Sequence, residues 1–204
     1  MKTFPILLNL RGRRVVVVGG GPVGLRRARA LAEAQAQVTL VDPAAAADAA
    51  GVTVVRQPYR KELLEGAFLV FACTDDHAVN RQIAADARAA GAMINAADQP
   101  DDCDFFLPAV WKDGDVVVAV GTGGSAPALA VYLRDRLAPS LPPQIGEFAR
   151  LVGELREALR QKVADRRRRG EIMTRLCSQE VLDAFLSEGP QAVHRKLEQL
   201  LAEV

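Results

Sequence analysis

Four consecutive valines lead directly into three glycines near the start of this chain. Such an apolar run is typical of a parallel strand that is buried on both faces. Three glycines after it have the spacing G-x-G-x-x-G: Gly19, Gly21 and Gly24. A helical pattern over residues 25–34 follows, and then a short apolar strand over residues 37–41 that ends at Asp42. Strand, tight turn, helix, strand and acid in this order predict a dinucleotide-binding unit.

The glycines and the acid have separate expected roles in that unit. Gly19 permits the tight turn, Gly21 lets the backbone approach a pyrophosphate, and Gly24 lets the helix pack closely on the strand. The helix start offers unpaired N–H groups to the pyrophosphate. Asp42 would accept hydrogen bonds from a ribose diol and repel a 2′-phosphate, so we expect NAD as the cofactor rather than NADP. The alternative is a glycine turn that binds no ligand.

Composition is that of an ordinary globular protein. Of the 204 residues, 50% are hydrophobic and 25% are charged, and the formal net charge is +1. This near-neutral balance argues against a nucleic-acid partner recruited by bulk charge. No apolar run reaches the ~20 residues that span a bilayer, so we expect no membrane partner. The segment before Arg11 has no signal-peptide cleavage site, which favours a cytoplasmic protein.

The three cysteines, Cys73, Cys103 and Cys177, are odd in number and lack C-x-x-C spacing. This pattern indicates neither a disulfide framework nor a zinc site, and we expect no permanent metal. Each cysteine is expected to be a small buried side chain.

Strand and helix patterns continue to alternate through the first half of the chain. The expected strands cover residues 52–55, 67–73 and 92–96, and the expected helices cover residues 60–64 and 77–90. We therefore expect an α/β fold in which residues 1–112 form a Rossmann domain.

The pattern then changes. Residues 105–111 and 115–120 predict a hairpin around a turn at Lys112-Asp113-Gly114, and a helix is expected over residues 127–137. These elements make up a connector over residues 113–141.

Residues 142–204 are expected to form an α-helical domain. It should begin with one long amphipathic helix over residues 144–169, followed by helical segments over residues 172–176 and 178–204. The run Arg166–Arg169 would end the long helix as a solvated face that complements the helix dipole. Alternatively, it would attract an acidic substrate.

Polar side chains follow two of the expected strands, at the edge of the sheet where ligands bind open α/β folds. Thr74 and Asp75 could contact the nicotinamide-side ribose, although Asp75 or Asp76 could instead cap the next helix. Asp98 follows the next strand, where a carboxylate can accept a proton while a neighbouring carbon gives hydride to NAD. It could also be a simple turn residue.

A second glycine-rich loop, residues 121–125, precedes the helix expected over residues 127–137. It is a candidate anion cradle, although it lacks the Lys-Ser/Thr of a Walker sequence. A flexible hinge is the alternative.

Several of these motifs, taken in order, resemble one known family. The motifs run from Leu7 to Arg13, Val17 to Val23, Ala72 to Asn80, Asn95 to Asp98, Phe105 to Ala109 and Val118 to Pro127. Together they resemble the precorrin-2 dehydrogenase family, the module that forms the N-terminal part of bacterial sirohaem synthase. The resemblance covers about residues 3–165.

This resemblance implies a Rossmann domain, a small dimerisation region and a helical domain that form a homodimer, with residues 116–120 and 128–137 as the expected seam. It also implies NAD-dependent oxidation of precorrin-2 to sirohydrochlorin, with Asp98 as the key aspartate. The implied cofactor contacts are Gly19, Gly21, Pro22, Val23, Gly24, Asp42, Pro43, Thr74 and Asp75. The implied substrate contacts are Asn95, Thr122, Gly123, Gly124 and Ser125, with Arg134, Arg136 and Arg150 as candidates for the substrate carboxylates.

Two features depart from the family pattern. Many members have an acidic residue in place of Pro22, and many lack a clear acid in place of Asp42, which here strengthens the expectation of NAD. The main alternative is a bifunctional enzyme that also inserts Fe²⁺ into sirohydrochlorin, with Asp98 as proton acceptor and transient metal contact. A remote alternative is a regulatory protein that senses NAD.

Overall fold

The computed structural model describes residues 3–45 and 49–203 of the chain. It divides into two compact units, one ending at Leu107 and the other beginning at Pro108. The sequence placed the end of the first domain later, at residue 112, whereas the whole hairpin belongs to the second unit. In the part of the chain that the structure describes, no helix is long and apolar enough to cross a membrane.

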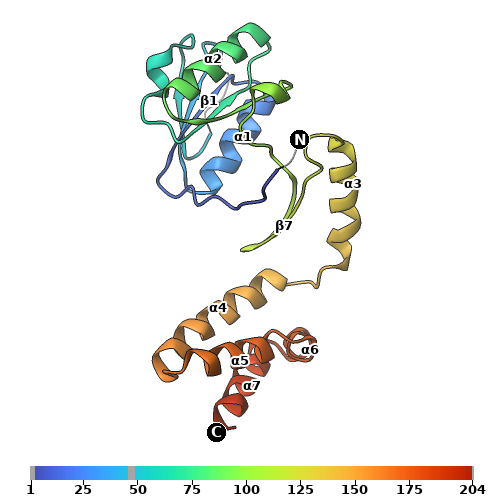
Figure 1. The fold of residues 1–204 in the computed structure, drawn as a ribbon. Coiled ribbons are helices and arrows are strands. Elements are labelled where there is room, and N and C mark those ends of the chain that lie inside the picture. Colours follow the sequence, from blue (N-terminus) through green and yellow to red (C-terminus); the bar gives the residue numbers. More distant parts are fainter. Residues whose placement is uncertain (1–2, 46–48, 204) are drawn as a thin grey trace. The chain divides into compact units, whose positions relative to one another are not determined.

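The first unit contains a parallel sheet of five strands in the order β3-β2-β1-β4-β5. Its elements are β1 (Arg14–Val18), α1 (Pro22–Glu33), β2 (Gln37–Val41), β3 (Val52–Val55), the 3-10 turn η1 (Lys61–Leu64), β4 (Leu69–Ala72), α2 (His77–Ala89), β5 (Met93–Ala96) and the 3-10 turn η2 (Pro100–Asp102). Helices α1 and α2 cover opposite faces of the sheet (Figure 1). The expected α/β, Rossmann-like fold is confirmed, with its switch point between β1 and β4.

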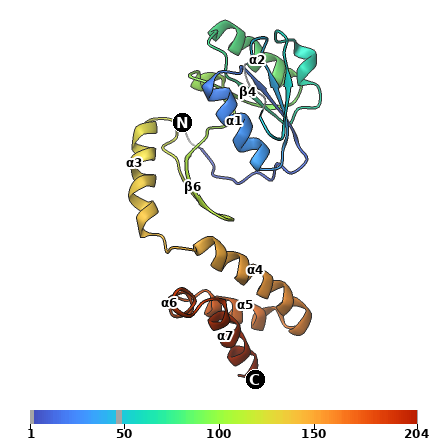
Figure 2. The ribbon, with the colours of Figure 1, turned by 180° about the vertical axis from the view of Figure 1, so that it is seen from behind.

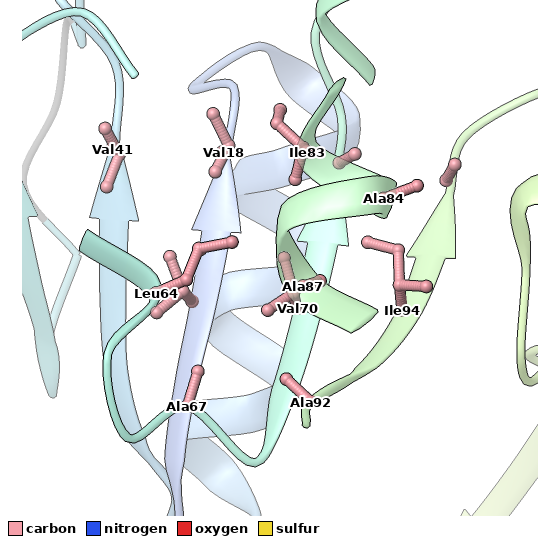
Figure 3. Close-up of a cluster of buried hydrophobic side chains, with 13 residues drawn as sticks. Val18, Val41, Leu64, Ala67, Val70, Ile83, Ala84, Ala87, Ala92 and Ile94 are labelled. Atoms are coloured by element: carbon pink, nitrogen blue, oxygen red, sulfur yellow. The ribbon is translucent and has the colours of Figure 1, made fainter. Parts of the chain in front are cut away.

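The valine run is buried because both faces of β1 are covered. Val16 and Val18 belong to the core cluster under α2, whereas Val15 and Val17 belong to the cluster under α1. All four valines are at most 2% exposed. Figure 3 shows the α2 side, where Ile83, Ala84 and Ala87 lie over the strand residues Val18, Val70 and Ile94. Each fully buried valine stabilises the fold by about 1.5–3 kcal/mol relative to an exposed one.

The second unit starts with an antiparallel hairpin of β6 (Ala109–Asp113) and β7 (Val116–Val120), as the sequence predicts. Helix α3 (Pro127–Leu137) contacts both strands and leads into the 3-10 turn η3 (Ala138–Ser140). The turn of the hairpin is fixed to the next helix, because Asp113 accepts a hydrogen bond of 2.9 Å from the Gly146 amide. A Cβ atom at Gly146 would collide with the Asp113 carbonyl group, so this contact requires glycine.

The expected long helix over residues 144–169 is wrong, because the structure has two helices there. Helix α4 (Ile145–Lys162) ends at an extended Val163, and α5 (Arg166–Leu176) starts anew at the N-cap Asp165, which accepts from the Arg167 amide at 2.9 Å. The segment over residues 178–204 is likewise divided into α6 (Gln179–Glu188) and α7 (Pro190–Ala202). Gly189, with a φ of +81°, separates them. Figure 2 shows α5, α6 and α7 gathered against one another in this unit.

The run Arg166–Arg169 therefore begins helix α5 rather than ending a helix. The expectation that it complements a helix dipole is wrong, because its charges lie at the positive end of the dipole. Its charges are tolerated because two of the side chains donate to the open carbonyl ends of other helices. Arg168 donates to the carbonyl oxygens of Leu200 and Glu203 at 2.8 and 2.7 Å. Arg169 donates to those of Val163 and Ala164 at 2.7 and 2.8 Å. These two arginines therefore act as helix caps.

Candidate nucleotide and active site

The carboxyl ends of the central strands meet at one edge of the sheet. Val18 of β1 is in register with Val41 of β2 and with Ala72 of β4, and Ala72 is in register with Ala96 of β5. The residues that follow these strands therefore emerge at the same level. They are the glycine turn, Asp42, Thr74 with Asp75, and Asp98. The first unit thus brings the expected cofactor contacts and the expected catalytic aspartate to a single edge.

The three glycines of the turn have different steric surroundings. Gly19 has a φ of +106°, and a Cβ atom there would collide with the carbonyl group of Cys73. A Cβ atom at Gly24 would collide with the carbonyl oxygen of Gly19. Gly21, in contrast, has no atom within 4 Å of such a position. The protein itself fills the space beside Gly19 and Gly24, whereas the space beside Gly21 is free for a ligand to approach the backbone.

The start of α1 lacks a side-chain cap. Its N-cap residue, Gly21, makes no side-chain capping bond, and the first turn contains no acidic residue. Pro22 and Val23 are exposed beside it. Free N–H groups and the positive end of the helix dipole make this start suited to an anion such as a pyrophosphate.

Asp42 is half-buried and bonded to the glycine turn. One carboxylate oxygen accepts from the Gly20 amide and the other accepts from the Ala44 amide at 2.7 Å. A Cβ atom at Gly20 would lie 3.0 Å from the Cβ of Asp42, so the two backbones approach closely. Pro43 is exposed. Each carboxylate oxygen retains a lone pair with which to accept from a ligand hydroxyl.

The loop after β4 is held by Asn80, a residue that sequence reasoning did not single out. Asn80 is 1% exposed. Its Oδ1 accepts from the Thr74 amide at 3.2 Å and from the Thr74 hydroxyl at 2.8 Å, and its Nδ2 donates to the Thr74 carbonyl at 2.9 Å. Asp76 is the N-cap of α2, accepting from Ala78 and Val79, which confirms the capping alternative for this residue. Asp75 is exposed beside it.

Asp98 lies in the turn after β5. It is exposed and has a φ of +57°, and its carboxylate forms no hydrogen bond or ion pair within residues 3–45 and 49–203. Asn95, by contrast, is buried at 6% exposure, and its Nδ2 donates to the Phe105 carbonyl at 2.9 Å. Its Oδ1 is buried and has no hydrogen-bond partner in the described part of the chain. Asp98 is thus free to act on a ligand, whereas Asn95 fixes the chain that leaves the sheet.

Arg27 is a second residue that the sequence did not reveal. From α1, its Nη1 lies 3.2 Å from Cys73 Sγ, and its guanidinium carbon lies 5.4 Å from the centre of the Phe71 ring. Among the described residues it has no carboxylate partner. Burial raises the pKa of the Cys73 thiol, and the positive charge of Arg27 opposes this rise. A half-buried cation therefore lies next to the end of β4.

The three arginines that the sequence suggested for the substrate carboxylates belong to the second unit. Arg134 pairs with Asp135 at 2.7 Å and Arg150 pairs with Glu154 at 2.6 Å, and all four residues belong to the second unit. Arg136 is exposed there.

The cysteines only partly follow the expectation. Cys73 is buried and Cys103 is half-buried, but Cys177 is exposed, so the expectation was wrong for Cys177. Burial is the main cause that raises the pKa of each thiol. Over the described residues, no group of three or more His, Cys, Asp or Glu side chains could hold a metal ion.

The glycine-rich loop of the second unit forms a turn closed on itself. The Thr122 carbonyl accepts from the amide and hydroxyl of Ser125 at 3.2 and 2.6 Å, and the Thr122 hydroxyl accepts from the Ala126 amide at 3.2 Å. Gly123 and Gly124 have φ values of +62° and +81°. The loop precedes α3, whose first turn has no side-chain cap.

Comparisons with known proteins agree with this geometry. Residues 6–109 match a family described as putative NAD(P)-binding, and residues 144–201 match one described as the sirohaem synthase dimerisation region. This chain belongs to the precorrin-2 dehydrogenase and sirohaem synthase family. The resemblance seen in the sequence motifs is therefore confirmed. The dimerisation match covers helices α4–α7 rather than the hairpin and α3.

Among the curated relatives, the sirohaem synthase of Methylococcus capsulatus is 39% identical over 83% of this chain and 37% of its own length. That of Methylobacillus flagellatus is 32% identical over 99% of this chain and 44% of its own length. The chain thus spans less than half the length of these relatives. A solved structure titled "SirC, precorrin-2 dehydrogenase" shares the fold, with a TM-score of 0.76 at 21% identity over 97% of this chain and 100% of that one.

Proposed function

We propose that this chain oxidises precorrin-2 to sirohydrochlorin with NAD, and that Asp98 is the general base. The observation that carries the proposal is the Asp98 carboxylate, which is unpaired within the described residues and lies at the same sheet edge as the glycine turn. The oxidation removes one hydride and one proton from the substrate. Among the described residues, Asp98 has no partner that competes for that proton, and an exposed carboxylate at this edge is accessible to a large substrate.

The residues at the edge fit the cofactor. The open space at Gly21 admits a phosphate to the backbone, and the uncapped start of α1 provides N–H groups for it. Asp42 would accept from the ribose hydroxyls and repel a 2′-phosphate, which favours NAD over NADP. Thr74 and Asp75 would contact the second ribose. When bound, NAD supplies the hydride acceptor.

The substrate carries several acetate and propionate groups, and these call for cations and N–H donors. Arg27 fits this need, because its guanidinium is held in place by Cys73 and Phe71 and has no carboxylate partner in the described part of the chain. Asn95 and the loop of Thr122, Gly123, Gly124 and Ser125 remain proposed substrate contacts on the strength of the family resemblance.

We also propose that the chain forms a homodimer through the hairpin and α3. Only Ala130 of α3 is buried, while Leu129, Tyr132 and Leu137 are 48%, 58% and 46% exposed. A helix with so much uncovered apolar surface indicates a partner. Sedimentation equilibrium of Tyr132→Glu should give a monomer. The matched control is Leu186→Glu on α6, and a monomer from that variant alone would place the seam in α4–α7 instead.

Anaerobic absorbance of the purified chain with precorrin-2 tests the enzymatic proposal. NAD should give sirohydrochlorin and NADP should give much less. Asp98→Asn should lower kcat about 100-fold or more while NAD binding stays unchanged, as expected for the loss of a general base. Full turnover in that variant would exclude Asp98 as the base. No NAD-dependent oxidation by the unmodified chain would leave a nucleotide-binding regulator as the better proposal.

The same assay addresses iron insertion. Fe²⁺ added after the oxidation is complete would be a substrate. As the iron displaces protons from the pyrrole nitrogens, Asp98 would accept them. Sirohaem forming faster than in a protein-free control would establish this second activity.

A further inference from the structure

The turn that carries Asp98 is held by a sulfur atom. Cys103 Sγ lies 3.2 Å from both the amide nitrogen and the carbonyl oxygen of Ala96, and 3.3 Å from the carbonyl oxygen of Gln99. Ala96 ends β5 and Gln99 directly follows Asp98. The sulfur thus contacts both ends of the turn. A neutral thiol can accept from the amide and donate to a carbonyl group at the same time.

The turn has an uncommon backbone conformation. Asp98 adopts the left-handed region with a φ of +57°, and its own side chain bonds to nothing within residues 3–45 and 49–203. Such a backbone persists when neighbouring groups determine it. Three other bonds contribute. The Gln99 amide donates to the Ala96 carbonyl at 3.5 Å, the Ala97 amide donates to the Ala72 carbonyl at 2.8 Å, and Gln99 Nε2 donates to the His77 carbonyl at 3.2 Å. The backbone bond between Gln99 and Ala96 is long, and among the described residues Cys103 Sγ is the side-chain atom that contacts both of these residues.

We propose that Cys103 is a positioning residue that places the Asp98 carboxylate for proton transfer. The proposal rests on the proposed function, in which Asp98 is the base. In this role Cys103 orients the turn and takes no part in the transfer of hydride or proton. Its loss would allow the turn to relax, and a base displaced by about 1 Å can cost about 100-fold in rate.

Steady-state kinetics of Cys103→Ala and Cys103→Ser provide the first test. Alanine removes every contact of the sulfur, so kcat should fall about 10- to 100-fold while KM for NAD changes less than about twofold. Serine keeps a donor and an acceptor and should restore kcat to within about fivefold of the unmodified chain. Cys177→Ala, an exposed cysteine in the second unit, is the matched control and should be fully active. An unchanged kcat in Cys103→Ala, or a rise in KM for NAD that equals the fall in kcat, would overturn the proposal.

A double-mutant comparison separates this proposal from the proposed function. In an Asp98→Glu background the carboxylate is already displaced, so Cys103→Ala should lower kcat by less than about threefold. A full additional loss would show that Cys103 acts independently of Asp98, while Asp98 would remain the base. Full turnover of Asp98→Asn would remove the base itself, and both proposals would fail together.

Discussion

The carbonyl oxygen of Gly19 occupies the position that a Cβ atom on Gly24 would take. The start of α1 therefore lies against the end of β1 with no room for a side chain. Gly21, between them, has a φ of −67° and open space at its Cβ position. Two glycines of one motif thus serve packing and the third leaves access to the backbone.

This difference predicts opposite results for two alanine substitutions. Gly24→Ala should destabilise the protein by about 1–3 kcal/mol or more, because the backbone must move, and urea unfolding would measure this. Gly21→Ala should unfold at the same urea concentration as the unmodified chain but bind NAD about 10-fold more weakly, or worse, by calorimetry. Unchanged NAD affinity in Gly21→Ala would argue against a phosphate at this position.

Asp42→Asn should weaken the discrimination between NAD and NADP. The asparagine keeps one oxygen for a backbone amide but loses the charge that repels a 2′-phosphate. The ratio of kcat/KM for NAD to that for NADP should fall about 10-fold or more, mainly through a better KM for NADP. An unaltered ratio would mean that Asp42 only stabilises the turn through its bonds to Gly20 and Ala44.

Arg27→Met should raise KM for precorrin-2 about 10-fold, because a guanidinium bound to a carboxylate is lost from a partly dry site. Arg29→Met, an exposed change on the same helix, is the control and should alter KM less than about twofold. If KM for NAD rises instead, the guanidinium of Arg27 faces the cofactor phosphates rather than the substrate.

Tyr59 should make stability depend on pH in the alkaline range. Burial, together with the hydrogen bond of 2.8 Å to Asp86, raises the pKa of this phenol above its ordinary value of 10.0. The unfolded chain then loses the proton before the folded chain does. The contribution of Tyr59 to stability is complete below about pH 10 and is lost as the pH rises through the folded pKa.

Tyr59→Phe should remove this dependence, at a cost of about 1 kcal/mol at neutral pH for the lost hydrogen bond. Urea unfolding of both proteins between pH 8 and about pH 11.5 would show the difference. If the free energies of unfolding of the two proteins decline in parallel as the pH rises, groups other than Tyr59 cause the loss of stability at alkaline pH.

Local sequence patterns were sufficient to predict the first secondary-structure elements of the first unit. The valine run, the glycine spacing and the acid after the second strand predicted β1, α1, β2 and their order, because each is written in a short stretch of sequence. The same reasoning failed for residues 144–169, where apolar spacing continues across a break at Val163. A single N-cap, Asp165, was a weaker signal than the amphipathic stripe that surrounds it.

The sequence by itself determined which residues end parallel strands, and therefore that Gly19, Asp42, Thr74 and Asp98 share an edge. Only the tertiary structure decided which polar groups there are free and which are occupied. Asn95 is bonded to Phe105, whereas Asp98 has no partner among the described residues. Arg27 of α1 meets Cys73, which directly follows β4, although the two residues are far apart along the chain. Hydrogen bonds between distant segments depend on packing in three dimensions, and no periodicity along the chain encodes them.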